Sequence, residues 1–219
     1  MSRPQPRIAI KICGLSTPES LDAAIRAGAS HVGFVHFPKS PRHVDFDRLT
    51  ALARRIPAGV AGVGVVVNPD DELVARLLAT APLAALQLHG TESPERLAAL
   101  RARFPGREFW KAVPVKTAAD IAGAVAWHGA ADRILFDAKT PDGAALPGGM
   151  GLRFDWTLLR AYRPVGPWGL SGGLDPANVA EAAHITGAPL VDVSSGVEST
   201  PGIKNMDKIA AFCEAVAQC

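Results

Sequence analysis

The chain has 219 residues, 48% of them hydrophobic, and its 23 basic and 21 acidic side chains leave a net charge of only +2. This size and composition favour one α/β domain with a sizeable core, and we expect residues 1–219 to form that single domain. Lys and Arg do not cluster in runs with interleaved aromatic residues, which argues against nucleic acid as a partner.

The cysteines and the apolar segments bear on the cellular compartment. Cys13, Cys213 and Cys219 are an odd number and lie far apart, without the Cys and His spacing of a metal site, so we expect a reduced, cytoplasmic protein without bound metal. Residues 1–7 are polar and Lys11 interrupts the apolar run that follows, which argues against a secretory signal. The apolar segments are too short to span a bilayer, so we expect no membrane partner.

Short apolar, β-branched segments recur along the chain, each followed by a helical pattern. This alternation predicts a parallel sheet built from βα units, and eight such units close a barrel. We therefore predict a single (β/α)8 barrel. The predicted strands are 7–13, 31–36, 61–67, 84–89, 108–113, 133–137, 167–171 and 190–193.

Helix boundaries are marked by proline and glycine. Thr17-Pro18-Glu19, Ser93-Pro94-Glu95 and Asp175-Pro176 have proline near a first helical position, and Gly28 and Gly187 stand where helices are expected to end. An open, doubly wound sheet is the alternative architecture. The barrel is favoured because the phosphate-binding signals described below follow the seventh and eighth units rather than the first.

Several predicted strands end in polar side chains that share one face. Because side chains alternate along a strand, Lys11 and Cys13 lie on one face and the neighbouring isoleucines on the other. The same parity groups Gln87 with His89, Asp137 with Leu135, and Asp192 with Ser194. The polar face is expected to point into the mouth of the barrel, where barrel enzymes hold their catalytic groups.

Cys13 and Asp137 are the candidate acid-base pair, since each closes an apolar strand. Each residue also has an ordinary structural interpretation. A single cysteine is often a small buried hydrophobe, a strand-end aspartate often caps a helix, and His89 on its own is compatible with a hydrogen-bonded core imidazole.

Two glycine-containing turns follow the last two predicted strands. Gly172 and Gly173 lie in the first turn, and Ser194, Ser195 and Gly196 in the second. Glycine lets backbone amides approach a phosphate closely, and turns after the seventh and eighth strands are the usual phosphate site of such barrels. A long loop, 139–151, directly follows Asp137 and is predicted to be an active-site lid, with a simple flexible insertion as the alternative.

Taken in order, these motifs resemble the phosphoribosylanthranilate isomerase family of tryptophan biosynthesis over nearly the whole chain. The matching segments are Lys11-Ile12-Cys13-Gly14, Gly33-Phe34 with Ser40-Pro41-Arg42, Gln87-Leu88-His89-Gly90, Asp137 with Gly148-Gly149-Met150-Gly151, Ser171-Gly172-Gly173-Leu174, and Asp192-Val193-Ser194-Ser195-Gly196-Val197-Glu198 with Pro201-Gly202 and Lys204.

The resemblance implies an Amadori rearrangement of a phosphorylated small molecule without cofactor or metal. Asp137 would be the general acid that opens the ribose ring, and Cys13 the base that removes the C2 proton. Lys11 would favour the Cys13 thiolate or, alternatively, form a structural ion pair with Asp192. The expected substrate-binding residues are Arg42 for the anthranilate carboxylate, together with Gln87, His89, Gly149, Gly172, Gly173, Asp192, Ser194, Ser195 and Gly196.

Three other functions remain open from the sequence, and the chain is expected to be a monomer or a homodimer. Indole-glycerol-phosphate synthase would need a lysine and glutamate acid-base set that is not evident here. The aminoaldose isomerase of histidine biosynthesis would need an aspartate in the place of Cys13. A barrel that binds phosphate without catalysis would use the same glycine turns, and the fold alone does not exclude it.

Overall fold

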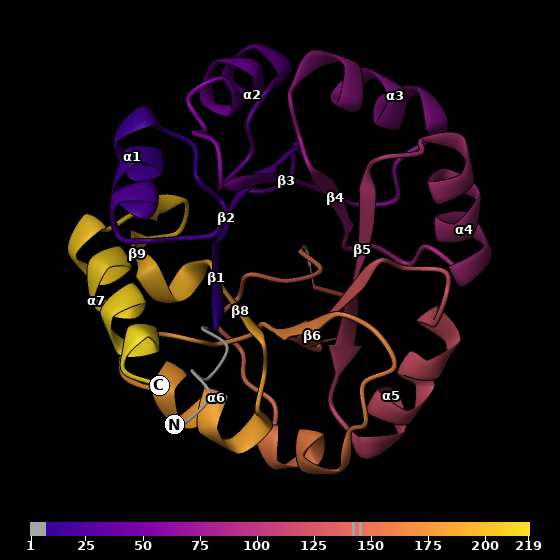
Figure 1. Cartoon of the computed structure of the whole chain (residues 1–219), viewed down its shortest axis with the longest axis vertical. Coiled ribbons are helices and arrows are strands. Elements are labelled where there is room, and N and C mark those ends of the chain that lie inside the picture. Colours follow the sequence, from indigo (N-terminus) through magenta and orange to yellow (C-terminus); the bar gives the residue numbers. More distant parts are fainter. Residues whose placement is uncertain (1–7, 142, 145) are drawn as a thin grey trace, which may run out of the picture.

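Eight parallel strands close into a barrel in the order β1 to β8, and helices surround it (Figure 1). The computed structural model describes residues 8–141, 143–144 and 146–219. This confirms the predicted barrel. The strands are β1 (Ala9–Ile12), β2 (His31–Val35), β3 (Ala61–Val66), β4 (Ala85–Leu88), β5 (Glu108–Val115), β6 (Arg133–Ala138), β7 (Trp168–Leu170) and β8 (Leu190–Val193).

Seven helices and a short hairpin complete the described part of the chain. The helices are α1 (Pro18–Arg26), α2 (Phe46–Ala53), α3 (Asp71–Thr80), α4 (Pro94–Arg103), α5 (Ala118–Gly123), α6 (Val179–Thr186) and α7 (Met206–Ala217). The hairpin pairs β9 (Glu198–Thr200) with β10 (Ile203–Lys204), and 3₁₀ turns cover Ala124–Trp127, Trp156–Ala161 and Ser195–Val197.

The predicted capping signals explain several helix ends. Thr17 and Ser93 accept hydrogen bonds from the backbone of the first turns of α1 and α4, each with proline at the start of the helix. Gly187 ends α6 with a positive φ of 64°. The prediction that Asp175-Pro176 opens a helix was wrong by a few residues, because Asp175 accepts the Ala177 N–H in a turn and α6 begins only at Val179.

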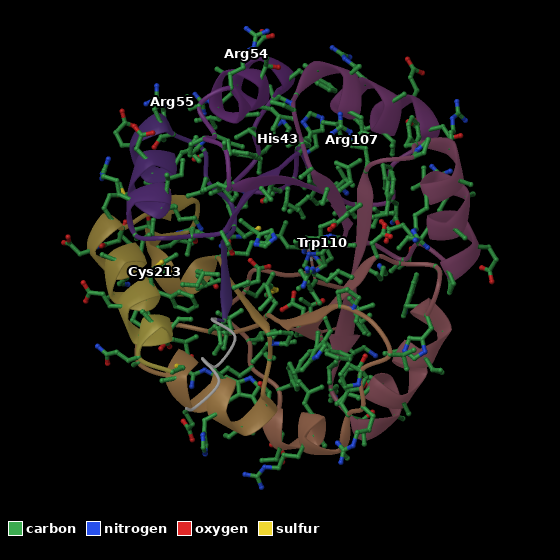
Figure 2. The ribbon with its side chains drawn as sticks, viewed as in Figure 1. His43, Arg54, Arg55, Arg107, Trp110 and Cys213 are labelled. Carbon is green, nitrogen blue, oxygen red and sulfur yellow. The ribbon has the colours of Figure 1, made fainter. Side chains whose placement is uncertain are left out.

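The lower part of the barrel interior, away from the carboxyl ends of the strands, contains an apolar cluster. Val63, Ala85, Trp110, Leu135 and Leu190 are buried together there, and Figure 2 shows Trp110 inside the ring of strands. A larger apolar core fills the space between the strands and the surrounding helices, and Cys213 of α7 is buried in it. Burial in an apolar environment raises the pKa of the Cys213 thiol to about 11, which suits a packing role.

Register in the barrel brings the polar positions of neighbouring strands together. Lys11 of β1 pairs with Asp192 of β8, and Gln87 of β4 pairs with Trp110 of β5. On the inward faces of β4, β6 and β8, the packing residues Ala85, Leu135 and Leu190 are each followed two positions later by a polar residue of the pocket, as the parity of the sequence predicted.

Some expectations concern residues outside the described ranges. The polar segment 1–7, Asp142 and Ala145 lie there, and the single domain over 1–219 stays a prediction. None of the helices in the described part of the chain combines the length and the apolar character needed to cross a membrane.

Candidate active site

A pocket lies at the carboxyl ends of the barrel strands, with about 820 Å³ of empty space when the open solvent at its mouth is included. Strand ends supply Cys13, Gln87, His89, Asp137 and Asp192 to its wall. The loops add six more of the predicted site residues to the lining, which are Arg42, Gly149, Gly172, Gly173, Ser194 and Ser195. Of the predicted site residues, Gly196 alone does not line this pocket.

Cys13 stands beside a fully buried ion pair. Lys11 Nζ lies 2.9 Å from Asp192 Oδ2, and the two side chains are 0% and 4% exposed. Gly33 makes room for the thiol, because a Cβ atom there would lie 2.9 Å from Cys13 Sγ. Both interpretations of Lys11 therefore hold in one geometry, since the lysine pairs with Asp192 and also lies next to the thiol.

Burial and charge oppose each other at Cys13. Burial raises the pKa of the Cys13 thiol, the Lys11 ammonium lowers it, and the Asp192 carboxylate raises it again, so that the pKa ends above its usual value. Burial lowers the pKa of Lys11, but the charges of Asp192 and Cys13 outweigh burial and raise it. Lys11 thus lowers the pKa of the Cys13 thiol, as expected from the sequence, but burial has the larger effect.

Asp137 is held by its own backbone and by His89. Asp137 Oδ1 accepts the N–H of Ala138 at 2.9 Å, and Asp137 Oδ2 lies 3.0 Å from His89 Nε2. Two glycines lie so close that a side chain at either would collide with this pair. A Cβ atom on Gly148 would be 2.6 Å from His89 Cε1, and one on Gly172 would be 2.7 Å from Asp137 Oδ1. The sequence did not predict that His89 binds Asp137.

Arg42 is already paired on one edge. Its Nε and Nη2 donate to the two carboxylate oxygens of Glu198 at 2.7 and 2.8 Å, and Nη2 also donates to the carbonyl of Gly149 at 3.0 Å. Arg42, which we expected to bind a substrate carboxylate, thus makes a bidentate contact with a protein carboxylate. Arg42 Nη1 donates to neither Glu198 nor the Gly149 carbonyl, so it is available to donate a hydrogen bond to a ligand.

Glu198 and Lys204 extend this network to the loop after β8. Lys204 Nζ donates to Glu198 Oε1 at 2.8 Å and to the Ser194 carbonyl at 2.9 Å. Ser194 Oγ in turn donates to the Cys13 carbonyl at 3.1 Å. Burial raises the pKa of Glu198, but the Arg42 and Lys204 cations outweigh it and lower the pKa, so the carboxylate stays charged. Sequence reasoning quoted both residues within motifs and gave neither a role.

The two glycine turns face the same end of the pocket. Gly172 and Gly173 have positive φ angles of 86° and 65°, a conformation that other residues rarely adopt. Neither backbone N–H donates a hydrogen bond to another described residue. Gly196 lies behind this wall, where a Cβ atom would be 1.9 Å from the Leu174 carbonyl oxygen, so it allows the two loops to pack together.

The long loop after β6 covers the pocket. Residues 146–152 line it, and the segment crosses the opening of the ring in Figure 1. Its Gly149 has a φ of 72°, and a Cβ atom there would lie 2.7 Å from Arg42 Nη1. This position agrees with the predicted lid, although Asp142 and Ala145 are not among the described residues.

Two acceptor atoms in the pocket wall have no hydrogen-bond partner among the described residues. They are Gln87 Oε1 and Asp192 Oδ1, and both side chains are buried. Unpaired buried acceptors cost free energy, and a ligand with hydroxyl or N–H donors would satisfy them. Across the described ranges, no cluster of three or more His, Cys, Asp or Glu side chains is arranged to hold a metal ion.

Comparison with known proteins decides the family. A family model described as N-(5'phosphoribosyl)anthranilate (PRA) isomerase matches residues 10–215. The chain belongs to this family. Among its curated members, the N-(5'-phosphoribosyl)anthranilate isomerase of Zymomonas mobilis subsp. pomaceae is 55% identical over 206 residues, which cover 94% of this chain and 96% of the relative. The isomerase of Rhodospirillum centenum is 52% identical, with 96% and 98% covered.

Solved structures of phosphoribosylanthranilate isomerases share the fold. The enzyme from Thermotoga maritima superposes with a TM-score of 0.87 at 35% identity, covering 97% of this chain and all of that one. A phosphoribosyl anthranilate isomerase in complex with reduced 1-(o-carboxyphenylamino)-1-deoxyribulose 5-phosphate superposes with a TM-score of 0.84 at 33% identity, over the same shares of the two chains.

Proposed function

We propose that this chain isomerises N-(5-phosphoribosyl)anthranilate to 1-(2-carboxyphenylamino)-1-deoxyribulose 5-phosphate, with Asp137 as general acid and Cys13 as general base. The observation that carries the proposal is the placing of a thiol and a carboxyl in the wall of one covered pocket. Membership of the isomerase family supports the same reaction. The step belongs to tryptophan biosynthesis.

Asp137 begins the reaction by protonating the oxygen of the ribose ring. The ring carbon–oxygen bond then breaks, and the nitrogen lone pair forms a Schiff base with C1. Asp137 Oδ1 already accepts the Ala138 N–H, so the transferable proton belongs on Oδ2, 3.0 Å from His89 Nε2. His89 would therefore contact the carboxyl oxygen that carries the transferable proton and fix its orientation.

Cys13 completes the rearrangement as its thiolate. It takes the C2 proton, the C–H electrons form the C1–C2 double bond of an enolamine, and the imine electrons return to nitrogen. The enolamine tautomerises to the ketone product. The Lys11 ammonium, which is completely buried beside the thiol, stabilises the thiolate that must form against the cost of burial.

The pocket has different chemistry at its two ends, as the substrate does. Val35, Phe37 and Val67 give an apolar wall near Arg42 that suits the anthranilate ring, with Arg42 Nη1 directed to its carboxylate. The free N–H groups of Gly172 and Gly173, with Ser194 and Ser195, suit the phosphate. Gln87 Oε1 and Asp192 Oδ1 would accept hydrogen bonds from the ribose hydroxyl groups between them.

Turnover by the purified protein tests this proposal. The substrate is mixed with enzyme in a chelator-containing buffer, and substrate and ketone product are separated by chromatography, since they have the same mass. Conversion without added metal or cofactor is the expected result. Binding of the substrate without conversion would favour a non-catalytic phosphate-binding barrel, and conversion of the histidine-pathway aminoaldose alone would favour that isomerase.

We also infer a cytoplasmic enzyme that works as a monomer or homodimer on a phosphorylated small molecule. Free cysteines throughout the described chain are typical of a reducing compartment. A related structure is described as monomers generated from the dimeric isomerase of Thermotoga maritima. Light scattering at several protein concentrations measures the oligomeric state of this chain.

A further inference from the structure

Glu92 and Lys111 form a buried ion pair just outside the pocket. Lys111 Nζ lies 2.7 Å from Glu92 Oε2, and each side chain is 3% exposed. Lys111 is paired in register with Leu88, so it lies on the outer face of the barrel wall, whereas Gln87 and His89 face inward. Removing two charges from water costs free energy, and an apolar pair of the same size is often equally stable. The pair therefore calls for an explanation other than stability.

The pair binds the backbone that follows His89. The Glu92 carboxylate accepts the Gly90 N–H at 3.0 and 3.1 Å, and Lys111 Nζ donates to the Gly90 carbonyl at 2.7 Å. The N–H of His89 itself donates to the Val66 carbonyl at 2.9 Å. The backbone is thus fixed on both sides of the imidazole.

Asn68, at the end of the neighbouring strand, joins the same arrangement. Its N–H donates to Glu92 Oε1 at 2.7 Å, and its Oδ1 accepts the Thr91 N–H at 2.8 Å. Asn68 has a φ of 46°, and no other described residue except glycines has a positive φ. Such a conformation persists only where the surroundings enforce it. A Cβ atom on Gly90 would lie 2.3 Å from Asn68 Oδ1, so the contact also requires glycine there.

We propose that Glu92 and Lys111, with Asn68, are positioning residues that hold His89 against Asp137. We call Asn68, Gly90, Glu92 and Lys111 the rim clamp. The single contact it serves is the 3.0 Å approach of His89 Nε2 to Asp137 Oδ2, which a small shift of the backbone would break. The inference rests on the proposed function, because it concerns how the general acid is held. None of the clamp residues lines the pocket, so they act through His89 rather than on the substrate.

The test removes both charges of the pair together. In Lys111→Met/Glu92→Gln no unpaired charge is left buried, so the variant is expected to fold. If the rim clamp positions His89, kcat of this variant should be about tenfold lower than that of the wild type, with KM within about threefold. A misplaced general acid affects the chemical step more than substrate binding. The nitrogen resonances of the His89 ring should shift in the same variant. Arg55→Met/Asp22→Asn removes an ion pair distant from the pocket and should leave the kinetics and the His89 resonances unchanged.

A second background shows whether the effect passes through His89. In a His89→Ala enzyme, removing the clamp pair should cost nothing further, because the group that it positions is absent. An equal loss in both backgrounds, or a wild-type kcat in the double variant, would overturn the inference. Failure of the proposed function gives another pattern, in which Asp137→Asn and His89→Ala retain wild-type kcat.

A milder variant keeps the inference testable if the double variant does not fold. Asn68→Gly accepts the same φ without strain but removes the Oδ1 contact with Thr91, and it leaves no buried charge unpaired. We expect a loss of about threefold in kcat at constant KM, which disappears when His89 is alanine. A loss of kcat that persists in the His89→Ala enzyme, or no loss in either the wild-type or the His89→Ala enzyme, would overturn the inference that the rim clamp positions His89.

Discussion

The lower and upper halves of the barrel interior are built from the same strands but hold different side chains. Leu135 packs in the apolar lower layer, and two positions further along β6 Asp137 lines the pocket. Leu190 and Asp192 show the same change along β8. Because one face of a strand repeats every second residue, a packing residue and a chemical residue can be adjacent on that face. Stability and chemistry should therefore be separable by substitutions only two residues apart.

The largest effect is expected from Asp137→Asn in the upper half. The amide keeps the size of the side chain but cannot donate the proton, so kcat should fall by roughly 10²- to 10⁴-fold. Product affinity, measured by calorimetry, and the melting temperature should remain close to wild type. A variant that melts early yet turns over normally would make Asp137 a structural residue, and the pairing of Asp137 with Cys13 would be abandoned.

Leu135→Ala should show the opposite pattern in the lower half. Leu135 is fully buried, and the missing side chain of Gly169 leaves it room, since a Cβ atom there would lie 2.7 Å from Leu135 Cδ2. The cavity is expected to lower the free energy of unfolding by about 2–5 kcal/mol, as measured by urea denaturation. Well below the melting temperature, kcat and KM should stay within about twofold. A kcat as low as that of Asp137→Asn would mean that the two layers are not separable.

Arg42→Lys is expected to have an intermediate effect, on binding rather than on kcat. Lysine keeps the charge but cannot pair with both Glu198 oxygens while directing another nitrogen to the substrate, so KM should rise by about tenfold. A substrate analogue without the anthranilate carboxylate serves as the control. Equal penalties for the two compounds would show that Arg42 contacts another part of the ligand.

The smallest effect concerns His31, at the base of the barrel interior. Burial and the charges of Arg133 and Lys11 lower the pKa of His31 to about 4, so the folded protein holds it neutral while the unfolded chain protonates near pH 6.5. The stability that depends on neutral His31 is thus complete above pH 7 and falls as the pH drops from about 6.5 towards 4.

Urea denaturation at pH 7 and pH 5 measures this dependence. With allowance for partial exposure, wild type should lose about 1–2 kcal/mol over this range, and His31→Asn should lose correspondingly less. An identical pH dependence in the two proteins would show that His31 is not the group responsible. A loss of kcat in His31→Asn at pH 7 would contradict its assignment to the lower half.

Local patterns in the sequence were sufficient to predict the barrel and the polar strand-end residues of the pocket wall. Strand ends and the faces of Cys13, Gln87 and Asp192 follow from a period of two residues, which depends only on neighbours in the chain. The glycine turn after β7 contains positive φ angles, which have a residue preference, whereas Gly196 after β8 is required by the close approach of Leu174. The start of α6 was missed, since a turn at Asp175 uses the same residue types as a helix cap.

Pairing between distant residues could not be predicted in this way. Arg42 and Glu198 are 156 positions apart. Nothing in the sequence indicated that the Glu198 carboxylate would bind the Arg42 guanidinium, which we had expected to bind the substrate carboxylate. The contact of His89 with Asp137 and the burial of Lys111 with Glu92 likewise depend on the register of three strands. The proton affinity of Cys13 depends on the balance of burial against two opposite charges, which only the three-dimensional arrangement defines.

The most direct test of the acid-base assignment is the turnover number of Cys13→Ser at saturating substrate. Serine has nearly the volume of cysteine and should occupy the space left by Gly33, but its hydroxyl is a far poorer base beside Lys11. With Cys13 as the base, kcat falls by about 10²-fold or more. A kcat within a few-fold of wild type would show that another group removes the C2 proton.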